Sequence, residues 1–477
     1  MRSNSLSLAG RKSRRERSRQ SRLMFSDPAF TENRQVRVHR WAPWIAGFSA
    51  AFVADAIKRY NLKPSDRTLV FDPFAGVGTT LVEGKMRGFN VTGCEINPFA
   101  IMACQVKLNW EVESEELADW VSKLAGYIRK IDSSNSAGAK SLHEFPEETK
   151  SGSQNPVAES ALRAPEGFRT REPFFDPAIE KKMLLLKEFI LEVPDPLRDH
   201  FWVAFGSILV KYSRYAYGPS LGRKTVMQIR ISQDAPVGDV LFRKMEEIRD
   251  DLRWIKNEVI PKLRSRPEHR ILDKSVFESL KEIRDESIDL VTTSPPYLNN
   301  YHYPRNTRPQ LYWLDLVKKP SDINHIESES FGKFWQSVRE LPPIDLAFKM
   351  PELSEVIETI RKQCPEKGTY GGNGWANYAA TYFNDVNRFF HDFKNKMKRN
   401  GIMVWIVGNS ILQGIEVKTE EYLAKIAESQ GLKRVDGGIH ILRKKRIGSS
   451  IVNTHVRSQA PANTTVLYEA AVILRRK

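Results

Sequence analysis

Short apolar runs alternate with helix-like stretches in the first hundred residues of the chain. Residues 68–72 (TLVFD) form a β-rich run that ends in the turn PFAGVG, and residues 79–88 (TTLVEGKMRG) have the composition of a helix. A second apolar run, residues 90–95 (NVTGCE), follows at once. This order of strand, glycine loop, helix and strand predicts a βαβ unit with a right-handed crossover. We therefore expect a mostly parallel, doubly wound sheet of the Rossmann-like α/β class.

The strand pattern then breaks off and resumes far along the chain. After a helical stretch at residues 99–110, about 160 residues lack it, which is too long for one βα connection. We therefore expect a large, mainly helical insert at residues 111–269. Within it, helices are predicted at residues 113–131, 176–215 and 237–261, and a long mobile polar loop at residues 132–167. Further strands are predicted at residues 270–273, 288–293, 401–410, 436–442 and 465–475, interrupted by a second insert without clear period at residues 301–372.

Two further helices are predicted between the last strands. One spans residues 375–397, and its apolar stripe, which should be core, consists of Tyr382, Val386, Phe389 and Phe393. The other spans residues 418–430. The expected organisation is thus a disordered basic tail at residues 1–22, one α/β domain built from residues 23–110, 270–300 and 373–477, and the two inserts at residues 111–269 and 301–372.

Composition and charge change this picture only in respect of partners. Hydrophobic residues make up 41% and charged residues 28% of the 477, as in ordinary globular proteins. The chain has 74 Lys and Arg against 58 Asp and Glu, and the net charge of +16 favours a polyanionic partner such as nucleic acid. Residues 1–22 carry seven Arg and Lys12 against Glu16 alone. This tail is either a solvated segment or an arm that grips a nucleic-acid backbone.

Cysteine usage and hydropathy bear on the compartment. The three cysteines, Cys94, Cys104 and Cys364, are too few and too scattered for a zinc site or a disulfide framework, which favours a reducing compartment. The most apolar long stretch, residues 41–57, is interrupted by polar residues and is shorter than the about 20 residues that cross a bilayer. We therefore expect a cytoplasmic protein without a membrane span or a metal centre.

The first motif with chemical content is the loop DPFAGVGTT at the end of the first predicted strand, with Glu95 at the end of the second. In open α/β sheets, ligands bind at the carboxyl ends of strands, and an acid about 20 residues after a glycine loop binds ribose hydroxyls. The loop lacks the third glycine and the lysine of phosphate-binding loops. Asp72 would repel a pyrophosphate but suits a cationic ligand such as S-adenosylmethionine. The alternative is a purely structural turn.

The second motif is SPPY, which directly follows the apolar strand at residues 288–293. Its two prolines stiffen the loop, so that backbone carbonyls and the hydroxyl of Ser294 can accept hydrogen bonds from an exocyclic amine. Tyr297 offers a ring face on which a base taken out of a duplex can stack. The alternative is a structural proline turn.

Together, DPFAGVGTT, Glu95 and TSPPYLNN resemble the exocyclic-amino DNA methyltransferases, and SPPY is similar to the N4-cytosine subclass. The resemblance covers about 200 residues, close to the size of a single domain, and leaves both inserts unmatched. It implies a Rossmann-like methyltransferase fold with S-adenosylmethionine as the methyl donor and double-stranded DNA as the partner. A restriction endonuclease is an optional further partner, and the oligomeric state is not indicated.

The resemblance also implies roles for particular residues. The catalytic residues would be Ser294, Pro295, Pro296 and Tyr297. The methionine part of the cofactor would be enclosed by Asp72, Phe74, Gly76 and Gly78, its ribose would be held by Glu95, and its adenine would face Asp273. A helix start between His39 and Ser49 is similar to the cofactor-facing helix of the family. Either insert is a candidate for target recognition.

Other residues near the motifs remain open candidates. His302 either approaches the substrate or, as the preferred interpretation, faces solvent. Four residues after the SPPY motif are candidates for contact with a phosphate or for filling the space left by a flipped base: Tyr301, Tyr303, Arg305 and Arg308. Residues 213–225, rich in Tyr, Gly and basic residues, suit either stacking and phosphate contact or a plain surface loop. Residues 408–410 are expected to wall the target pocket.

The working hypothesis is a methyltransferase that flips a cytosine out of double-stranded DNA and methylates its N4. Methylation of an aromatic amine needs alignment of its lone pair with the sulfonium rather than a covalent enzyme intermediate. A C5-cytosine mechanism would need a nucleophilic cysteine, and none of the three cysteines stands directly after either proline motif. The alternatives are N6 of adenine in DNA, a base in RNA, or a non-catalytic nucleic-acid-binding module.

Overall fold

The computed structural model describes residues 25–44, 47–136, 160–217, 220–230, 235–299, 301–445 and 466–477. The predicted basic tail and most of the polar loop predicted at residues 132–167 lie outside the described residues. None of the described helices is long and apolar enough to cross a membrane.

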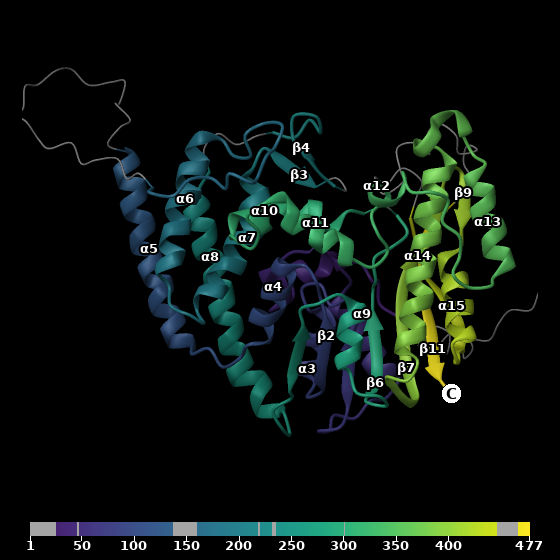
Figure 1. The fold of residues 1–477 in the computed structure, drawn as a ribbon. Helices are drawn as coiled ribbons and strands as arrows, with labels where there is room; N and C mark the ends of the chain where they lie inside the picture. Colours follow the sequence, from purple (N-terminus) through teal and green to yellow (C-terminus); the bar gives the residue numbers. More distant parts are fainter. Residues whose placement is uncertain are drawn as a thin grey trace, which may run out of the picture.

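A seven-stranded sheet forms the centre of the protein, with strand order β10-β11-β7-β6-β1-β2-β5 (Figure 1). The strands are β1 (Leu69–Asp72), β2 (Asn90–Cys94), β5 (His269–Leu272), β6 (Ile288–Thr293), β7 (Met397–Gly408), β10 (Leu432–Lys445) and β11 (Leu467–Arg476). β1, β2, β5, β6 and β7 pair in parallel, and β11 runs antiparallel between β7 and β10. The predicted strands and the mostly parallel, doubly wound sheet are thus confirmed.

Both faces of this sheet are buried, because consecutive side chains of each strand point to opposite faces. Val70 belongs to one apolar cluster and its neighbour Phe71 to another, and the same alternation separates Leu290 from Val291 on β6. The first face is covered by α2 (Ala50–Arg59), α3 (Thr79–Met86) and α4 (Pro98–Leu108). The second is covered by α9 (Val276–Ser279), α14 (Gly372–Phe393) and α15 (Thr419–Ser429). The stripe predicted for α14 is fully buried in the second cluster.

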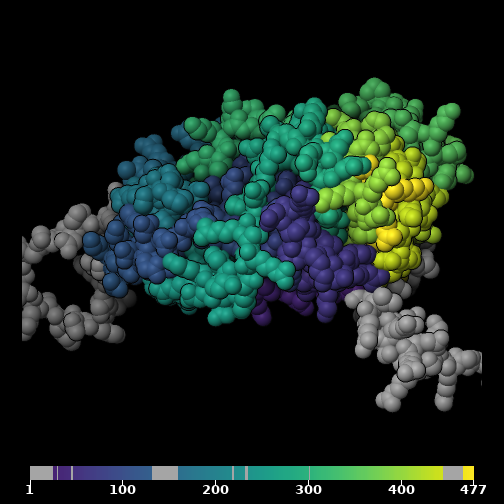
Figure 2. Space-filling model, turned by 90° about the horizontal axis from the view of Figure 1, so that it is seen from below, coloured from purple at the N-terminus to yellow at the C-terminus, as the bar shows by residue number. Residues whose placement is uncertain are grey.

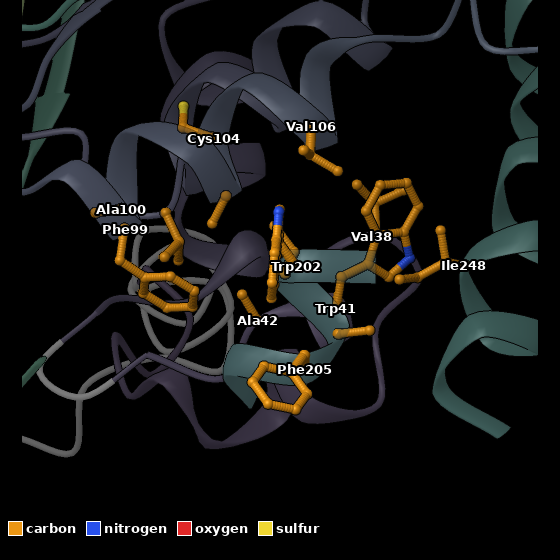
Figure 3. Close-up of a cluster of buried hydrophobic side chains, with 14 of the residues drawn as sticks. Val38, Trp41, Ala42, Phe99, Ala100, Cys104, Val106, Trp202, Phe205 and Ile248 are labelled. Atoms are coloured by element: carbon orange, nitrogen blue, oxygen red, sulfur yellow. The ribbon is translucent and has the colours of Figure 1, made fainter. Parts of the chain in front are cut away.

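The first insert is a helical layer that packs on α4 (Figure 1). It contains α5 (Ser114–Ser136), α6 (Pro177–Glu192), α7 (Arg198–Tyr212), the β3–β4 hairpin (Tyr215–Tyr217 and Leu221–Arg223), α8 (Val237–Trp254), the π-helix η3 (Ile255–Val259) and the short 3-10 helix η4 (Ile260–Lys262). Phe99 of α4 and Phe205 of α7 share one apolar cluster with Val38 (Figure 3). In the space-filling view the insert and the C-terminal helices occupy opposite ends of the molecule (Figure 2).

A buried carboxylate ties this insert to the segment that precedes the sheet. Asp251 of α8 is fully buried and accepts hydrogen bonds from the Val38 amide and the Trp41 indole, both at 2.9 Å, and from the Arg40 guanidinium at 2.8 Å. Because a buried charge is tolerated only when it is paired and hydrogen-bonded, these contacts fix α8 against the N-terminal segment. The insert is therefore packed into the core of the protein.

The second insert is helical, although no helix was predicted in it. It contains α10 (Tyr303–Trp313), α11 (Pro320–Glu329), α12 (Trp335–Val338), α13 (Pro351–Arg361) and the 3-10 helix η6 (Pro365–Tyr370). The prediction missed the helical period of α13, where Leu353, Ile357 and Ile360 are buried. Several of these helices begin with proline, which is favoured in the first turn. α10 packs on α4 and α7, whereas α12 and α13 pack on α14. The second insert thus contacts helices on both faces of the sheet.

The remaining elements are short and lie mostly near the N-terminus or the strand ends. They are η1 (Phe30–Arg34), η2 (His39–Trp41), η5 (Leu280–Glu282), β8 (Ser410–Leu412) and β9 (Ile415–Val417). The helix start expected between His39 and Ser49 is found at Ser49, whose hydroxyl caps α2 by accepting a hydrogen bond from the Phe52 amide at 3.2 Å.

Candidate active site

A cavity lies at the point where the strand order reverses, between β1 and β6. The carboxyl ends of parallel strands at such a point form the ligand crevice of open α/β sheets. The cavity has a volume of about 130 Å³. It is lined by the glycine loop, by residues after β2, β5 and β6, and by residues of the second insert. The two motifs identified in the sequence therefore meet in one place.

Asp72 ends β1 and lies behind the wall of this cavity. Its Oδ1 accepts hydrogen bonds from the Thr293 hydroxyl at 2.6 Å and from the Phe74 amide at 3.0 Å, so it joins the ends of β1 and β6. Its Oδ2 is buried and has no hydrogen-bond partner among the described residues. Burial raises the pKa of Asp72 to about 6. Asp72 thus holds the loop in place and carries one unsatisfied acceptor.

Glycine is required at two positions of the loop for different structural reasons. Gly76 lines the cavity with a φ of +52°, and a Cβ there would lie 3.2 Å from the Trp44 indole nitrogen. Gly78 has a φ of +84° and starts α3, and a Cβ there would lie 2.6 Å from the Cys104 sulfur. Gly76 is therefore required where the backbone faces the cavity, whereas Gly78 is required for packing beneath it.

A buried lysine that the sequence analysis missed supports this loop. Lys107 of α4 is fully buried, and its ammonium donates a hydrogen bond to the Val77 carbonyl at 3.2 Å. Desolvation lowers the pKa of Lys107 to about 7. No sequence signal marked it, because a single lysine in an apolar helix is indistinguishable from a surface residue.

Glu95 follows β2 and faces the cavity. Its Oε2 accepts a hydrogen bond from the Gly76 amide at 2.8 Å, and its Oε1 accepts from the amides of Ile96 and Asn97 at 2.9 and 2.8 Å. Burial raises the pKa of Glu95. A carboxylate has about four acceptor positions, so about one remains for a ligand. Asn97, which also lines the cavity, caps α4 and was not singled out from the sequence.

The segment after β5 reaches the cavity one residue later than the sequence suggested. Asp273 is exposed and is not among the residues that line the cavity, whereas Lys274, Ser275 and Val276 are. Contact between Asp273 and an adenine ring stays a prediction.

The SPPY segment forms the wall opposite the glycine loop. Ser294, Pro296 and Tyr297 line the cavity, and Pro295 is buried behind them. The Ser294 hydroxyl donates a hydrogen bond to the Tyr297 hydroxyl at 3.2 Å. Burial, with a smaller contribution from the nearby Glu469, raises the pKa of Tyr297 well above its usual range. The Tyr297 side chain therefore offers the cavity a neutral hydroxyl group and an apolar ring face.

Residues 408–410 support this wall from behind. A Cβ at Gly408 would lie 3.4 Å from the Tyr297 ring, so this glycine lets the ring pack against the end of β7. The Ser410 hydroxyl donates a hydrogen bond to the Leu298 carbonyl at 2.5 Å. Neither Gly408 nor Ser410 lines the cavity itself, and both position the SPPY segment. That residues 408–410 wall the target pocket stays a prediction.

Residues from the second insert close the cavity; His302 was an open candidate from the sequence, whereas Glu327, Phe331 and Phe334 were not found. The Phe331 ring contacts the Phe74 ring, with centroids 4.9 Å apart. His302 stacks on Phe334 at 3.9 Å and forms a hydrogen bond with Glu327. The His302 side chain is only 13% exposed, so the preferred interpretation of a solvent-facing histidine is wrong. These side chains lie in a region without hydrophobic period, where no pattern marks them.

Comparisons with known proteins point to the same activity as the residues of the site. No protein-family model matches the chain. The chain is 24% identical over 454 residues to the Type II methyltransferase M.BsoBI of Geobacillus stearothermophilus, covering 88% of this chain and 83% of that protein. The homologues of this chain are Type II methyltransferases. M.MvaI of Kocuria varians and M.AvaI of a Nostoc strain are each 21% identical to it, over 82% and 84% of this chain and 80% of each relative.

Two solved chains of the rRNA methyltransferase aviRa from Streptomyces viridochromogenes also match, with 9% and 10% identity and TM-scores of 0.27 and 0.28. They cover 90% and 92% of this chain, and the matches span 85% and 93% of theirs. The sheet order and the cavity at its reversal point are those of a Rossmann-like methyltransferase fold, as the sequence predicted.

Proposed function

We propose that the protein is a DNA methyltransferase that transfers a methyl group from S-adenosylmethionine to the exocyclic N4 of cytosine in double-stranded DNA, with the base flipped out of the duplex. One observation carries the proposal: the SPPY segment lines the same cavity as Glu95, an acid at the position where such sheets bind a ribose. The Type II methyltransferase names of the relatives support DNA as the substrate and a restriction endonuclease as a partner.

The residues present fit S-adenosylmethionine in chemistry, although the cavity is tight. Glu95 keeps an acceptor position for a ribose hydroxyl, Gly76 presents backbone, and the buried Oδ2 of Asp72 favours a cationic group nearby. We assign the methionine part to Phe74 and Gly76, which line the cavity, while Asp72 and Gly78 shape the loop from behind it. We assign the ribose to Glu95 and the adenine to the segment from Asp273 to Val276. Small-molecule sites usually exceed about 300 Å³, so we expect side chains of the cavity wall to move when the ligand binds.

The SPPY residues would orient the base rather than react with it. When bound, S-adenosylmethionine supplies an electrophilic methyl group on a sulfonium. The Ser294 hydroxyl and the backbone carbonyls of the stiff proline segment accept hydrogen bonds from the exocyclic amine, which fixes its lone pair. The ring of Tyr297 stacks on the base. The aromatic wall excludes water, which strengthens these hydrogen bonds.

Cofactor affinity should depend on pH through Asp72. Its pKa of about 6 lies above the ordinary value of 3.8, so the carboxyl is ionised at pH 7.5 and about nine-tenths protonated at pH 5. We expect the affinity for S-adenosylmethionine, measured by calorimetry, to fall about tenfold between these pH values. Stability should change in the opposite sense, because folding favours the protonated form and that contribution is lost as the pH rises from about 4 to about 6.

The matched variant is Asp72→Asn, which cannot ionise and should lose the part of the pH dependence that is due to Asp72, with weak binding throughout. A wild-type affinity that does not change between pH 5 and 7.5 would exclude Asp72 from cofactor recognition.

The proposed reaction is tested by incubating the protein with methyl-labelled S-adenosylmethionine and double-stranded DNA, single-stranded DNA or RNA. We expect label in the double-stranded DNA. Label confined to RNA would place the protein with RNA methyltransferases, and absence of S-adenosylmethionine binding would favour a non-catalytic nucleic-acid-binding protein.

A further inference from the structure

A second cavity, of about 360 Å³, adjoins the first. Its size lies in the range of small-ligand sites, roughly 300–1,000 Å³. It is formed where four parts of the chain meet: the segment from Arg34 to Trp44, α4, the helical insert with its β3–β4 hairpin, and the start of the second insert with α10. It shares three lining residues, Trp44, Tyr301 and Tyr303, with the first cavity.

The charged side chains that line this second cavity are all cationic. They are Arg34, Lys211 and Lys224, and no Asp or Glu is among the described residues that line it. A cavity wall with cations and no acids has a positive potential, which attracts an anionic group. The nearby Arg223 differs, since it forms an ion pair with Glu172 at 2.7 Å and does not line the cavity.

Lys224 is a buried cation in the wall of this cavity. The residue is only 8% exposed, and its ammonium donates a hydrogen bond to the Lys211 carbonyl at 2.9 Å. The described residues provide no carboxylate within ion-pairing distance of it. Burial lowers the pKa of Lys224, as expected for a cation without a counter-charge. An ammonium has three donors, so two remain for an anion.

The aromatic residues around this lysine indicate what kind of anion it would take. Tyr217 from the hairpin lines the cavity and is fixed by a hydrogen bond from its hydroxyl to the Asn306 carbonyl at 2.8 Å. The rings of Tyr301 and Tyr303 meet edge to face at 4.8 Å and separate the two cavities. Aromatic faces beside a cation are the combination that binds a strand of nucleic acid.

We propose that the second cavity binds a phosphate of the DNA strand that carries the target base, with Lys224 as the principal phosphate ligand. This inference rests on the proposed function and adds a substrate contact to it. Because the cavity shares a wall with the SPPY cavity, a phosphate held there would anchor the strand next to the flipped nucleotide. Of the two interpretations of residues 213–225, the structure favours phosphate contact over a plain surface loop.

The test is the salt dependence of duplex binding by the variant Lys224→Gln. Loss of one phosphate contact should reduce the slope of log K against log salt concentration by about 0.9, measured with a fluorescent random-sequence duplex. A hydrogen bond to a charged group contributes about 1.5–3 kcal/mol, so we expect Kd to rise about tenfold or more at fixed low salt. The affinity for S-adenosylmethionine should not change, which also shows that the variant is folded.

Two further variants make the test specific. Lys224→Arg keeps the charge and should keep the wild-type slope. Arg223→Gln removes the charge of the neighbouring residue, which does not line the cavity, and should also leave the slope unchanged. The proposal is wrong if Lys224→Gln keeps the wild-type slope or if Arg223→Gln lowers the slope equally. It is also wrong if Lys224→Gln weakens the binding of S-adenosylmethionine instead of the binding of duplex DNA. Wild-type protein that binds no duplex at all would overturn the proposed function as well, whereas duplex binding with an unchanged Lys224→Gln slope would overturn this proposal alone.

Discussion

Replacement of Tyr297 by alanine is expected to lower kcat for methyl transfer about 100-fold while leaving the Kd of S-adenosylmethionine within about threefold of wild type. Base stacking on an aromatic ring contributes about 1–3 kcal/mol, and a misplacement of about 1 Å alone reduces a rate by about 100-fold. Tyr297 belongs to the wall opposite the glycine loop, so its loss should affect the base and not the cofactor. Single-turnover kinetics and calorimetry separate the two effects.

Two controls accompany this variant. Tyr297→Phe removes only the hydroxyl that pairs with Ser294, and one hydrogen bond of about 0.5–1.5 kcal/mol predicts a loss of about tenfold or less. Tyr370→Ala removes a tyrosine that is 54% exposed and lines neither cavity, and it should leave kcat unchanged. Parallel loss of methyl transfer and cofactor affinity in Tyr297→Ala would mean that the base pocket has been misplaced.

Replacement of Glu95 by alanine should have the complementary effect, with the Kd of S-adenosylmethionine raised about 100-fold. The variant loses the acceptor for a ribose hydroxyl and leaves the amides of Gly76, Ile96 and Asn97 without their partner. Hydrogen bonds to a charged group contribute about 1.5–3 kcal/mol each, and about 1.4 kcal/mol corresponds to a tenfold change in affinity. Calorimetry measures the affinity, and the melting temperature should also fall.

Glu329→Ala is the matched control for this second prediction. Glu329 also lines the cavity but is exposed and is not bonded to the glycine loop in the described structure. Its removal should change the Kd by about threefold or less. An equal loss of affinity in both variants would show that the general negative charge of the cavity, rather than the position of Glu95, binds the cofactor.

The sheet was predictable because buried parallel strands are continuous apolar runs. Val70 and Phe71 face opposite clusters, so both positions must be apolar, and the same reason makes β6 and β7 visible in the sequence. The glycine loop, Glu95 and the SPPY segment were predictable because each stands directly after such a strand, and those ends converge in any parallel sheet.

The rest of the site depends on contacts that no local pattern encodes. Phe331 and Phe334 reach the cavity from the short connection between α11 and α12, where neither a strand end nor a helical period marks them. Lys224 is recognisable as a cavity residue only after the β3–β4 hairpin has been placed against α10. Asp72 was expected in the pocket, but the hydrogen bond from Thr293 holds it behind the wall.

The proposed methylation of N4 of cytosine in the SPPY cavity is tested most directly by mass spectrometry of the nucleosides released from duplex DNA after reaction with the purified protein and S-adenosylmethionine. The proposed function predicts N4-methylcytosine, formed about 100-fold more slowly by the Tyr297→Ala variant under the same conditions. N6-methyladenine as the sole modified nucleoside, or a methylated base found only in RNA, would contradict it.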